Sequence, residues 1–232
     1  MSTTPAPPSL WRKMLAETVG TGLLVAIVVG SGIAAQRLSP SDTGLQLLEN
    51  ALATAMGLAV LIVVLQPVSG AHLNPVVTIA DRALGAPGNS KQVLGYVVAQ
   101  CSGAVGGAVL ANAMFSTPTT LSTTDRATPG HLLAEVVATA GLVLVIFALA
   151  RTRRSHLVGP AVGAYIGAAC WFTSSTSFAN PAVTLGRVFT DTFAGIAPTS
   201  VGPYALAQLA GAGAGVGLVL MLFPGARKTV RS

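Results

Sequence analysis

The chain has 232 residues, of which 52% are hydrophobic and only 9% are charged. A soluble domain usually carries about 25% charged residues, so this chain has too few charges to cover its own surface in water. The composition therefore excludes an ordinary soluble domain and indicates an integral membrane protein.

The net charge of +6 does not point to nucleic acid, because the basic residues lie between apolar segments and form no soluble basic module. Cys101 and Cys170 both fall inside apolar segments, which favours buried free thiols. No group of His, Cys, Asp or Glu has the spacing of metal ligands, so we expect no metal and no other cofactor. We find no nucleophile–base pair and no phosphate loop, so we do not expect an enzyme.

Hydrophobic runs divide the chain into six predicted membrane spans. The first ten residues are polar and Pro-rich, and the first apolar run lacks a clear cleavage site, so we expect a retained span and not a signal peptide. Each span is long enough, or nearly so, to cross a hydrocarbon core of about 30 Å. The spans are about Leu15–Ala35, Leu47–Leu65, Val93–Phe115, Leu132–Ala150, Leu157–Trp171 and Tyr204–Phe223. Two further apolar segments, about Asn74–Ala83 and Asn180–Phe189, are too short to span.

The basic residues predict the orientation of the chain. Of the 13 Lys and Arg residues, six crossings leave only Arg37, Arg126 and Arg187 on one side. Because positive charge accumulates on the cytoplasmic side, both termini are expected in the cytoplasm.

The two halves of the chain repeat each other. Ala16-Glu17 opens the first span and Ala134-Glu135 opens the fourth, and each short segment holds one Asn-Pro. The third and sixth spans carry the matching runs Tyr96–Ala104 and Tyr204–Ala212. Three spans per half force the halves to insert in opposite directions, which predicts an inverted repeat with the functional site at the interface of the halves.

Each Asn-Pro predicts a sharp helix start. Asn is a strong N-cap, and Pro is favoured at the first helical position because its missing N–H is not needed there. Two re-entrant half-helices would meet start to start at the midplane, each carrying about half a positive elementary charge. Such a centre repels cations, while the Asn amides can donate hydrogen bonds to a passing neutral solute.

At this point the sequence resembles the aquaporin and aquaglyceroporin family, the major intrinsic proteins. The resemblance runs from about Leu15 to Phe223, and its motifs are Ser69-Gly70-Ala71-His72-Leu73-Asn74-Pro75 and Phe178-Ala179-Asn180-Pro181-Ala182. It implies an all-α fold of six transmembrane helices and two half-helices, in a homotetramer with one pore per subunit. The pore centre would be formed by Asn74, Pro75, Val76, Asn180, Pro181 and Ala182. The channel domain would cover residues 13–223, with repeats at about 13–115 and 131–223 between cytoplasmic tails of residues 1–12 and 224–232.

The resemblance also gives roles to three residues near the half-helices. Glu17 and Glu135 would accept hydrogen bonds from the loop backbone, and His72 would brace its loop. The alternative for the two carboxylates is a place near a span end, where they reach headgroup water.

The family's four-residue selectivity filter departs from its usual pattern here. The position that usually holds Arg is Val183, and counting back from Asn180 gives Ser177 and Ala168. Counting back from Asn74 gives Thr54, or Met56 if the first loop is shorter. The set Thr54, Ala168, Ser177 and Val183 contains no aromatic and no charge, which predicts a wide, weakly polar filter.

Val183 and the run Trp171–Pro181 look like a bacterial aquaglyceroporin subgroup associated with arsenic resistance. The implied solutes are glycerol-like molecules, uncharged metalloid hydroxides and methylated arsenicals, with water passing as well. The competing interpretations are an ion-coupled transporter and a conventional water or glycerol channel.

Arg187 lies one helical turn beyond Val183. We expect it to supply charge to the outer vestibule; the alternative is an interfacial Arg that meets lipid or Asp191. Without an Arg at Val183, the half-helix dipoles alone would exclude protons, and restoring Arg there would tighten the exclusion.

Overall fold

The computed structural model describes residues 8–224, and all regular structure in that range is helical. The long helices are α1 (Leu10–Leu38), α2 (Thr43–Ser69), α4 (Ser90–Met114), α5 (Pro129–Arg151) and α8 (Pro198–Leu222). The shorter helices are α3 (Pro75–Ala83), α6 (Val158–Phe172) and α7 (Pro181–Gly186), with 3-10 turns η1 (Ser155–Leu157) and η2 (Arg187–Phe189).

The structure contains five helices that are long and apolar enough to cross a membrane within the described range. All five begin before the predicted spans, because polar N-caps such as Asp42 and Thr128 start α2 and α5 earlier. Helices α4 and α8 end one residue before the predicted ends at Phe115 and Phe223. The fifth predicted span is shorter than a typical crossing: α6 has 15 residues, because residues 155–157 form a 3-10 turn in front of it.

The predicted tails are only partly described. Helix α1 already begins at Leu10, inside the predicted tail of residues 1–12. Residues 1–7 and 225–232 lie outside the described range, and with them Arg227, Lys228 and Arg231 of the orientation argument.

The helix packing repeats between the two halves. Helix α1 packs along α4, α5 packs along α8 in the same way, and α2 packs along α6 to join the halves. The short helices cross over: α3 contacts α8, and α7 contacts α4, so each rests on a long helix of the opposite half. This exchange is the contact pattern expected of an inverted repeat.

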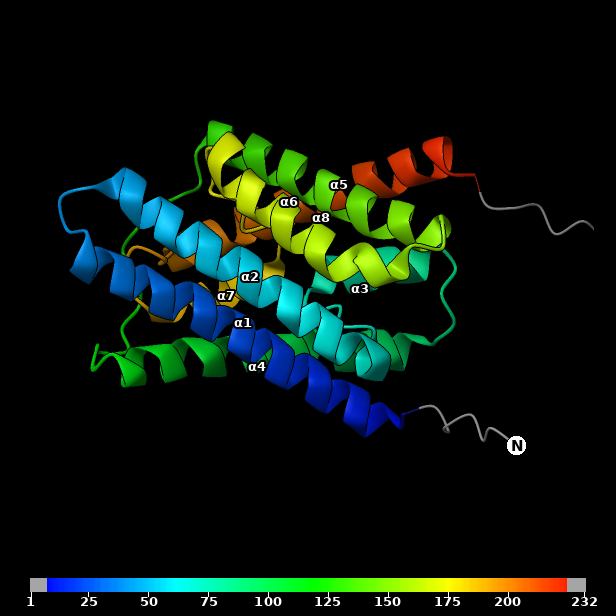
Figure 1. Ribbon diagram of the computed structural model, residues 1–232, viewed down its shortest axis with the longest axis horizontal. Coiled ribbons are helices and arrows are strands. Elements are labelled where there is room, and N and C mark those ends of the chain that lie inside the picture. The colour runs from blue at the N-terminus through cyan, green and yellow to red at the C-terminus, as the bar shows by residue number, and fades with distance from the viewer. Residues whose placement is uncertain (1–7, 225–232) are drawn as a thin grey trace, which may run out of the picture.

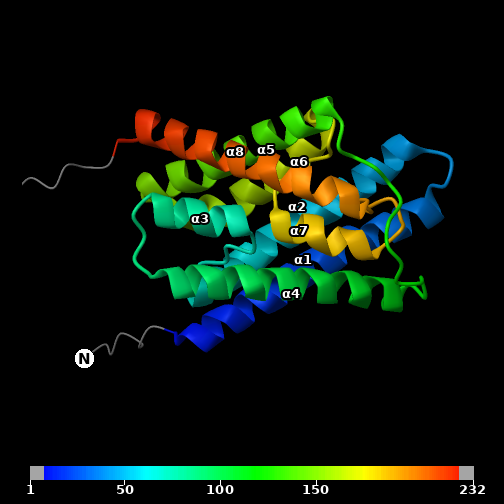
Figure 2. The same cartoon turned by 180° about the vertical axis from the view of Figure 1, so that it is seen from behind.

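The bundle has two ends that differ in their loops. Helix α1 begins and α8 ends at the same end, which we call the terminal end (Figure 1). The opposite, distal end carries the loops of residues 116–128 and 190–197. Helices α3 and α7 begin near the middle of the bundle and run towards opposite ends (Figure 2).

Small residues bring the helices of each half into close contact. A Cβ at Gly103 or Gly107 of α4 would overlap the carbonyl groups of Thr18 or Gly22 of α1. Gly211 is the counterpart in α8, where a Cβ would lie 2.5 Å from the carbonyl oxygen of Val136 in α5. Such contacts are typical of helix packing in lipid.

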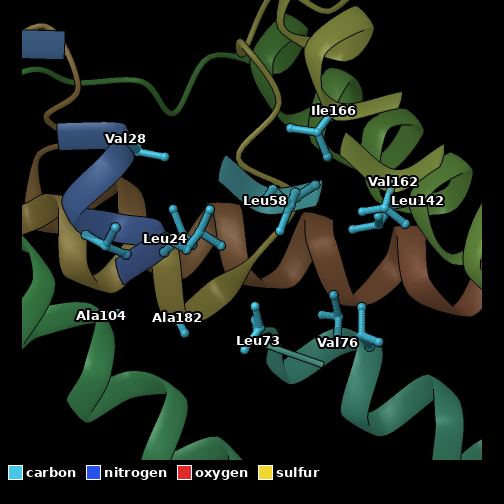
Figure 3. Close-up of a cluster of buried hydrophobic side chains, with 14 of the residues drawn as sticks. Leu24, Val28, Leu58, Leu73, Val76, Ala104, Leu142, Val162, Ile166 and Ala182 are labelled. Atoms are coloured by element: carbon cyan, nitrogen blue, oxygen red, sulfur yellow. The ribbon is translucent and has the colours of Figure 1, made fainter. Parts of the chain in front are cut away.

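An apolar wall faces the middle of the bundle (Figure 3). Its residues come from four of the helices: Leu24 and Val28 from α1, Leu58 from α2, Leu142 from α5, and Val162 and Ile166 from α6. Leu73, just before α3, completes this wall and is 1% exposed.

Candidate functional site

The two short helices begin as their Asn-Pro pairs predict. The Asn74 side-chain oxygen accepts the N–H of Val76 at 3.1 Å, and the Asn180 oxygen accepts the N–H of Ala182 at 3.0 Å. Pro75 and Pro181 occupy the first helical positions, where the absence of an N–H costs no hydrogen bond.

The two helix starts are tied to each other by reciprocal hydrogen bonds. The Asn74 amide nitrogen donates to the carbonyl of Ala179, and the Asn180 amide nitrogen donates to the carbonyl of Leu73, each at 2.8 Å. Each amide nitrogen carries two N–H groups, so one donor on each remains for another partner.

The loops before the two starts share an unusual backbone. Ala71 and Leu73 have φ values of 49° and 50°, and their repeat partners Ser177 and Ala179 have 52° and 47°. Left-handed backbone is unfavourable for residues with a side chain, so other contacts must hold these loops in place.

Glu17 holds the first loop. Its side chain is 0% exposed, which rules out the alternative that it reaches headgroup water. It accepts hydrogen bonds from the N–H of His72 (3.0 Å) and of Leu73 (2.6 Å), the hydroxyl of Ser69 (2.6 Å) and the amide of Gln100 (2.8 Å).

Glu135 holds the second loop with an equivalent set of four donors. It is also 0% exposed. It accepts hydrogen bonds from the N–H of Phe178 (2.9 Å) and of Ala179 (2.8 Å), the hydroxyl of Ser175 (2.6 Å) and the amide of Gln208 (2.6 Å). Four hydrogen bonds compensate the burial of each carboxylate.

His72 and Phe178 occupy equivalent places in the two loops. His72 packs edge-on against Tyr96, with ring centres 5.4 Å apart, and Phe178 packs likewise against Tyr204 at 5.2 Å. His72 also contacts the hydroxyl of Thr78 at 3.1 Å and the carboxylate of Asp81 at 3.6 Å. Within residues 8–224 no cluster of His, Cys, Asp or Glu could hold a metal ion.

A single cavity of about 400 Å³ connects the two helix starts with both ends of the bundle. Asn74 and Asn180 both line it, together with the apolar wall of Figure 3. Its charged lining residues are Lys13, Asp81 and Arg187, and none of them lies beside the two Asn residues.

Three of the four predicted filter residues line this cavity: Thr54, Ser177 and Val183. The alternative to Thr54, Met56, is 64% exposed and points away from it. The first loop is therefore not shortened, and Thr54 rather than Met56 lines the cavity.

The prediction for Ala168 is wrong. Ala168 is exposed and does not line the cavity, whereas Ile166 and Cys170 of the same helix do. Residues two apart on an α-helix point about 200° apart, while residues four apart share a face. Counting twelve residues back from Asn180 therefore selected the wrong face of α6.

Arg187 lies inside the protein. It is 6% exposed, lines the cavity, and donates a hydrogen bond from Nε to the carbonyl of Ala194. Its guanidinium carbon lies 3.4 Å from the centre of the Phe178 ring. The alternative of an interfacial Arg is wrong, because Asp191 accepts its hydrogen bonds from Ser122 and Thr123 instead.

The cavity lining is richer than the four predicted filter residues suggest. Phe178 adds an aromatic ring that the filter prediction did not include, and Arg187 adds the charge that was predicted for the outer vestibule. The repeat itself held a signal for Arg187: it lies seven residues after Asn180, as Asp81 lies seven residues after Asn74.

Apolar helices of membrane length, and two short helices that meet start to start beside one cavity, define a helical membrane pore protein. The sequence model for the major intrinsic protein family matches residues 5–177, and the chain belongs to this family. Its members are channels, so this protein is a channel and not an enzyme.

Among curated relatives, the chain is 46% identical to aquaglyceroporin AqpS of Rhizobium meliloti (strain 1021), over 96% of this chain and 94% of that protein. It is 37% identical to aquaporin NIP6-1 of Arabidopsis thaliana, over 69% of this chain and 53% of that protein. Among solved structures, the aquaglyceroporin from Plasmodium falciparum has a TM-score of 0.69 at 21% identity, covering 91% of this chain and 96% of that one. This structural likeness supports the fold.

Proposed function

We propose that this aquaglyceroporin-type channel passes small uncharged solutes passively along the cavity beside Asn74 and Asn180. The observation that carries the proposal is the cavity itself, which is lined by both helix starts and by residues near both ends of the bundle. The free amide N–H of each Asn offers a hydrogen bond to a solute oxygen at the narrow centre.

We further propose six crossings of the cell membrane with both termini in the cytoplasm. Helix α6 and the turn η1 in front of it are continuous over residues 155–172, which supports a sixth crossing. The terminal end, where α1 begins and α8 ends, is then the cytoplasmic end (Figure 1). The distal end, with Arg37, Arg126 and Arg187, is the outer end. A homotetramer with one cavity per chain follows the family pattern.

Both buried carboxylates hold loops through hydrogen bonds, which favours passive flux over ion coupling. A coupled carrier needs an ionisable group near the midplane to bind the driving ion. Glu17 and Glu135 are each engaged by four donors that hold a loop. The charged residues of the lining lie towards its ends.

The filter we propose consists of Thr54, Cys170, Ser177 and Val183, with Cys170 in place of Ala168. All four side chains are small, and the buried hydroxyls of Thr54 and Ser177 have no hydrogen-bond partner among the described residues. A wide ring of small, weakly polar side chains suits glycerol-like molecules, metalloid hydroxides such as arsenite in its neutral form, and methylated arsenicals. Water passes as well.

A stopped-flow comparison of proteoliposomes tests this proposal. We expect glycerol, neutral arsenite and a methylated arsenical to enter faster than in protein-free vesicles, with flux that is linear in the solute gradient. Water flux with all three solutes excluded would contradict the wide filter. Solute flux that stops when the proton gradient is collapsed would contradict the passive mechanism.

A further inference from the structure

Arg187 carries a positive charge that has no counter-ion in the structure. It lines the distal part of the cavity at 6% exposure, and no carboxylate within residues 8–224 lies within ion-pair distance of it. The one hydrogen bond of its side chain in this range goes from Nε to the Ala194 carbonyl. The outer N–H groups of the guanidinium are therefore not committed to the described part of the protein.

The surroundings hold this guanidinium in one place. Its central carbon lies 3.4 Å from the centre of the Phe178 ring, and the backbone N–H of Phe178 is itself held by Glu135 at 2.9 Å. A buried charge without a partner is unfavourable, so its immobilisation beside a solute path indicates a use for its electric field.

We propose that Arg187 is the residue that excludes protons and cations from the distal half of the pore. It stands one turn beyond Val183, the position where the family pattern places an Arg, and replaces that charge from a neighbouring position. The inference rests on the proposed channel function. It also replaces the expectation that the half-helix dipoles alone provide the exclusion.

The equivalent position in the first half carries the opposite charge. Asp81 lines the terminal part of the cavity, close to His72 at 3.6 Å, as Arg187 lines the distal part beside Phe178. Lys13 lines the terminal part as well and offsets the charge of Asp81, whereas Arg187 is the charged residue of the distal lining among the described residues. The barrier to cations therefore stands at the distal mouth and the pore centre.

The test is the proton leak of proteoliposomes that hold a pH dye, divided by the glycerol flux of the same vesicles. We expect Arg187→Gln to raise this ratio on the order of tenfold, because a unit charge is removed from a poorly screened site. Arg187→Lys keeps the charge and should stay near wild type. Asp81→Asn should leave the ratio equal or lower it.

Two further variants sharpen the test. Arg37→Gln removes a charge from the same end of the bundle, where Arg37 is exposed and does not line the cavity, so it should match wild type. Val183→Arg placed in the Arg187→Gln background should bring the leak down again, because it returns a guanidinium to the distal half of the pore.

An Arg187→Gln channel that conducts glycerol with the proton leak of wild type would overturn the inference. An absence of glycerol flux in wild type would instead overturn the proposed function. If Arg187→Gln does not insert, folded wild type is treated with butanedione, which neutralises accessible arginines. The leak should then rise in wild type and stay low in Arg187→Lys; an equal response of both channels would contradict the role of Arg187.

Discussion

The two halves of this channel build the same support and then present different side chains to the cavity. Glu17 and Glu135 each accept hydrogen bonds from two backbone N–H groups of their loop, and both loops end in an Asn-Pro helix start. Beyond the start, the first half places Asp81 in the lining and the second half places Arg187. The shared part fixes where the pore lies, and the differing part places opposite charges at equivalent positions of the two halves.

The largest expected effect comes from removing a shared carboxylate. Glu17→Leu or Glu135→Leu leaves four buried donors without an acceptor, at about 1 to 3 kcal/mol each. Because a whole domain is stable by only about 5–15 kcal/mol, we expect neither variant to yield folded channel. Yield and thermal melting in detergent measure this loss.

Glu49→Leu is the matched control, because Glu49 accepts only the hydroxyl of Ser39 in the described part of the chain. It should remain folded. If one half tolerated the loss of its carboxylate while the other did not, the two supports would not be equivalent.

A smaller effect is expected where glycine lets two helices of the same half pack closely. Gly107→Val in α4 and Gly211→Val in α8 would drive a side chain into the backbone of the neighbouring helix. Overpacking of this kind costs about 1–3 kcal/mol, so we expect a clearly lowered melting temperature in both halves.

Gly106→Val and Gly213→Val are the controls, because no atom lies within 4 Å of a Cβ at either position. They should melt as wild type does. A similar loss in Gly106→Val would show that β-branching in the helix, and not close packing, causes the effect.

The smallest effect concerns the distal loop of residues 116–128, which joins the two halves and has no counterpart at the terminal end. The backbone N–H of Thr123 donates to Asp191 and lowers the pKa of this carboxyl below its ordinary value of 3.8. The N–H favours the charged form, so its stabilisation is present at neutral pH and is lost as the pH falls through the lowered pKa. Asp191→Asn should therefore loosen the loop of residues 116–128 at neutral pH.

Trypsin cleavage at Arg126 in reconstituted channel measures this loosening, and we expect a modest acceleration. In wild type, pepsin should reach the exposed Leu121 more readily as the pH falls through the lowered pKa of Asp191. Equal trypsin rates for Asp191→Asn and wild type would show that Asp191 does not anchor the loop.

Local signals in the sequence were sufficient for the helix starts and the long spans. Asn followed by Pro begins a helix through its own side chain, and a long apolar run needs no tertiary contact to be recognised. Such local signals could not predict which face of α6 lines the cavity. Residues 158–170 are almost all apolar and many are small, so their periodicity does not distinguish Ala168 from Cys170.

Arg187 lies at the end of α7. The predicted half-helix ran to Phe189, but the α-helix ends at Gly186 and residues 187–189 form a tighter 3-10 turn. Gly186 keeps helical dihedral angles, so Arg187 still follows Val183 at helical spacing, and only the residues after it turn more tightly. The partners of Arg187, Phe178 and Ala194, are known only from the fold.

The most direct test of the cavity as the solute path is a matched pair on α6. Cys170→Phe places a ring in the proposed filter, and Ala168→Phe places the same ring on the exposed face of the helix. In stopped-flow measurements, we expect Cys170→Phe to abolish glycerol flux while some water flux remains, and Ala168→Phe to conduct both as wild type does. Blocked glycerol flux in Ala168→Phe, with normal flux in Cys170→Phe, would contradict this path through the protein.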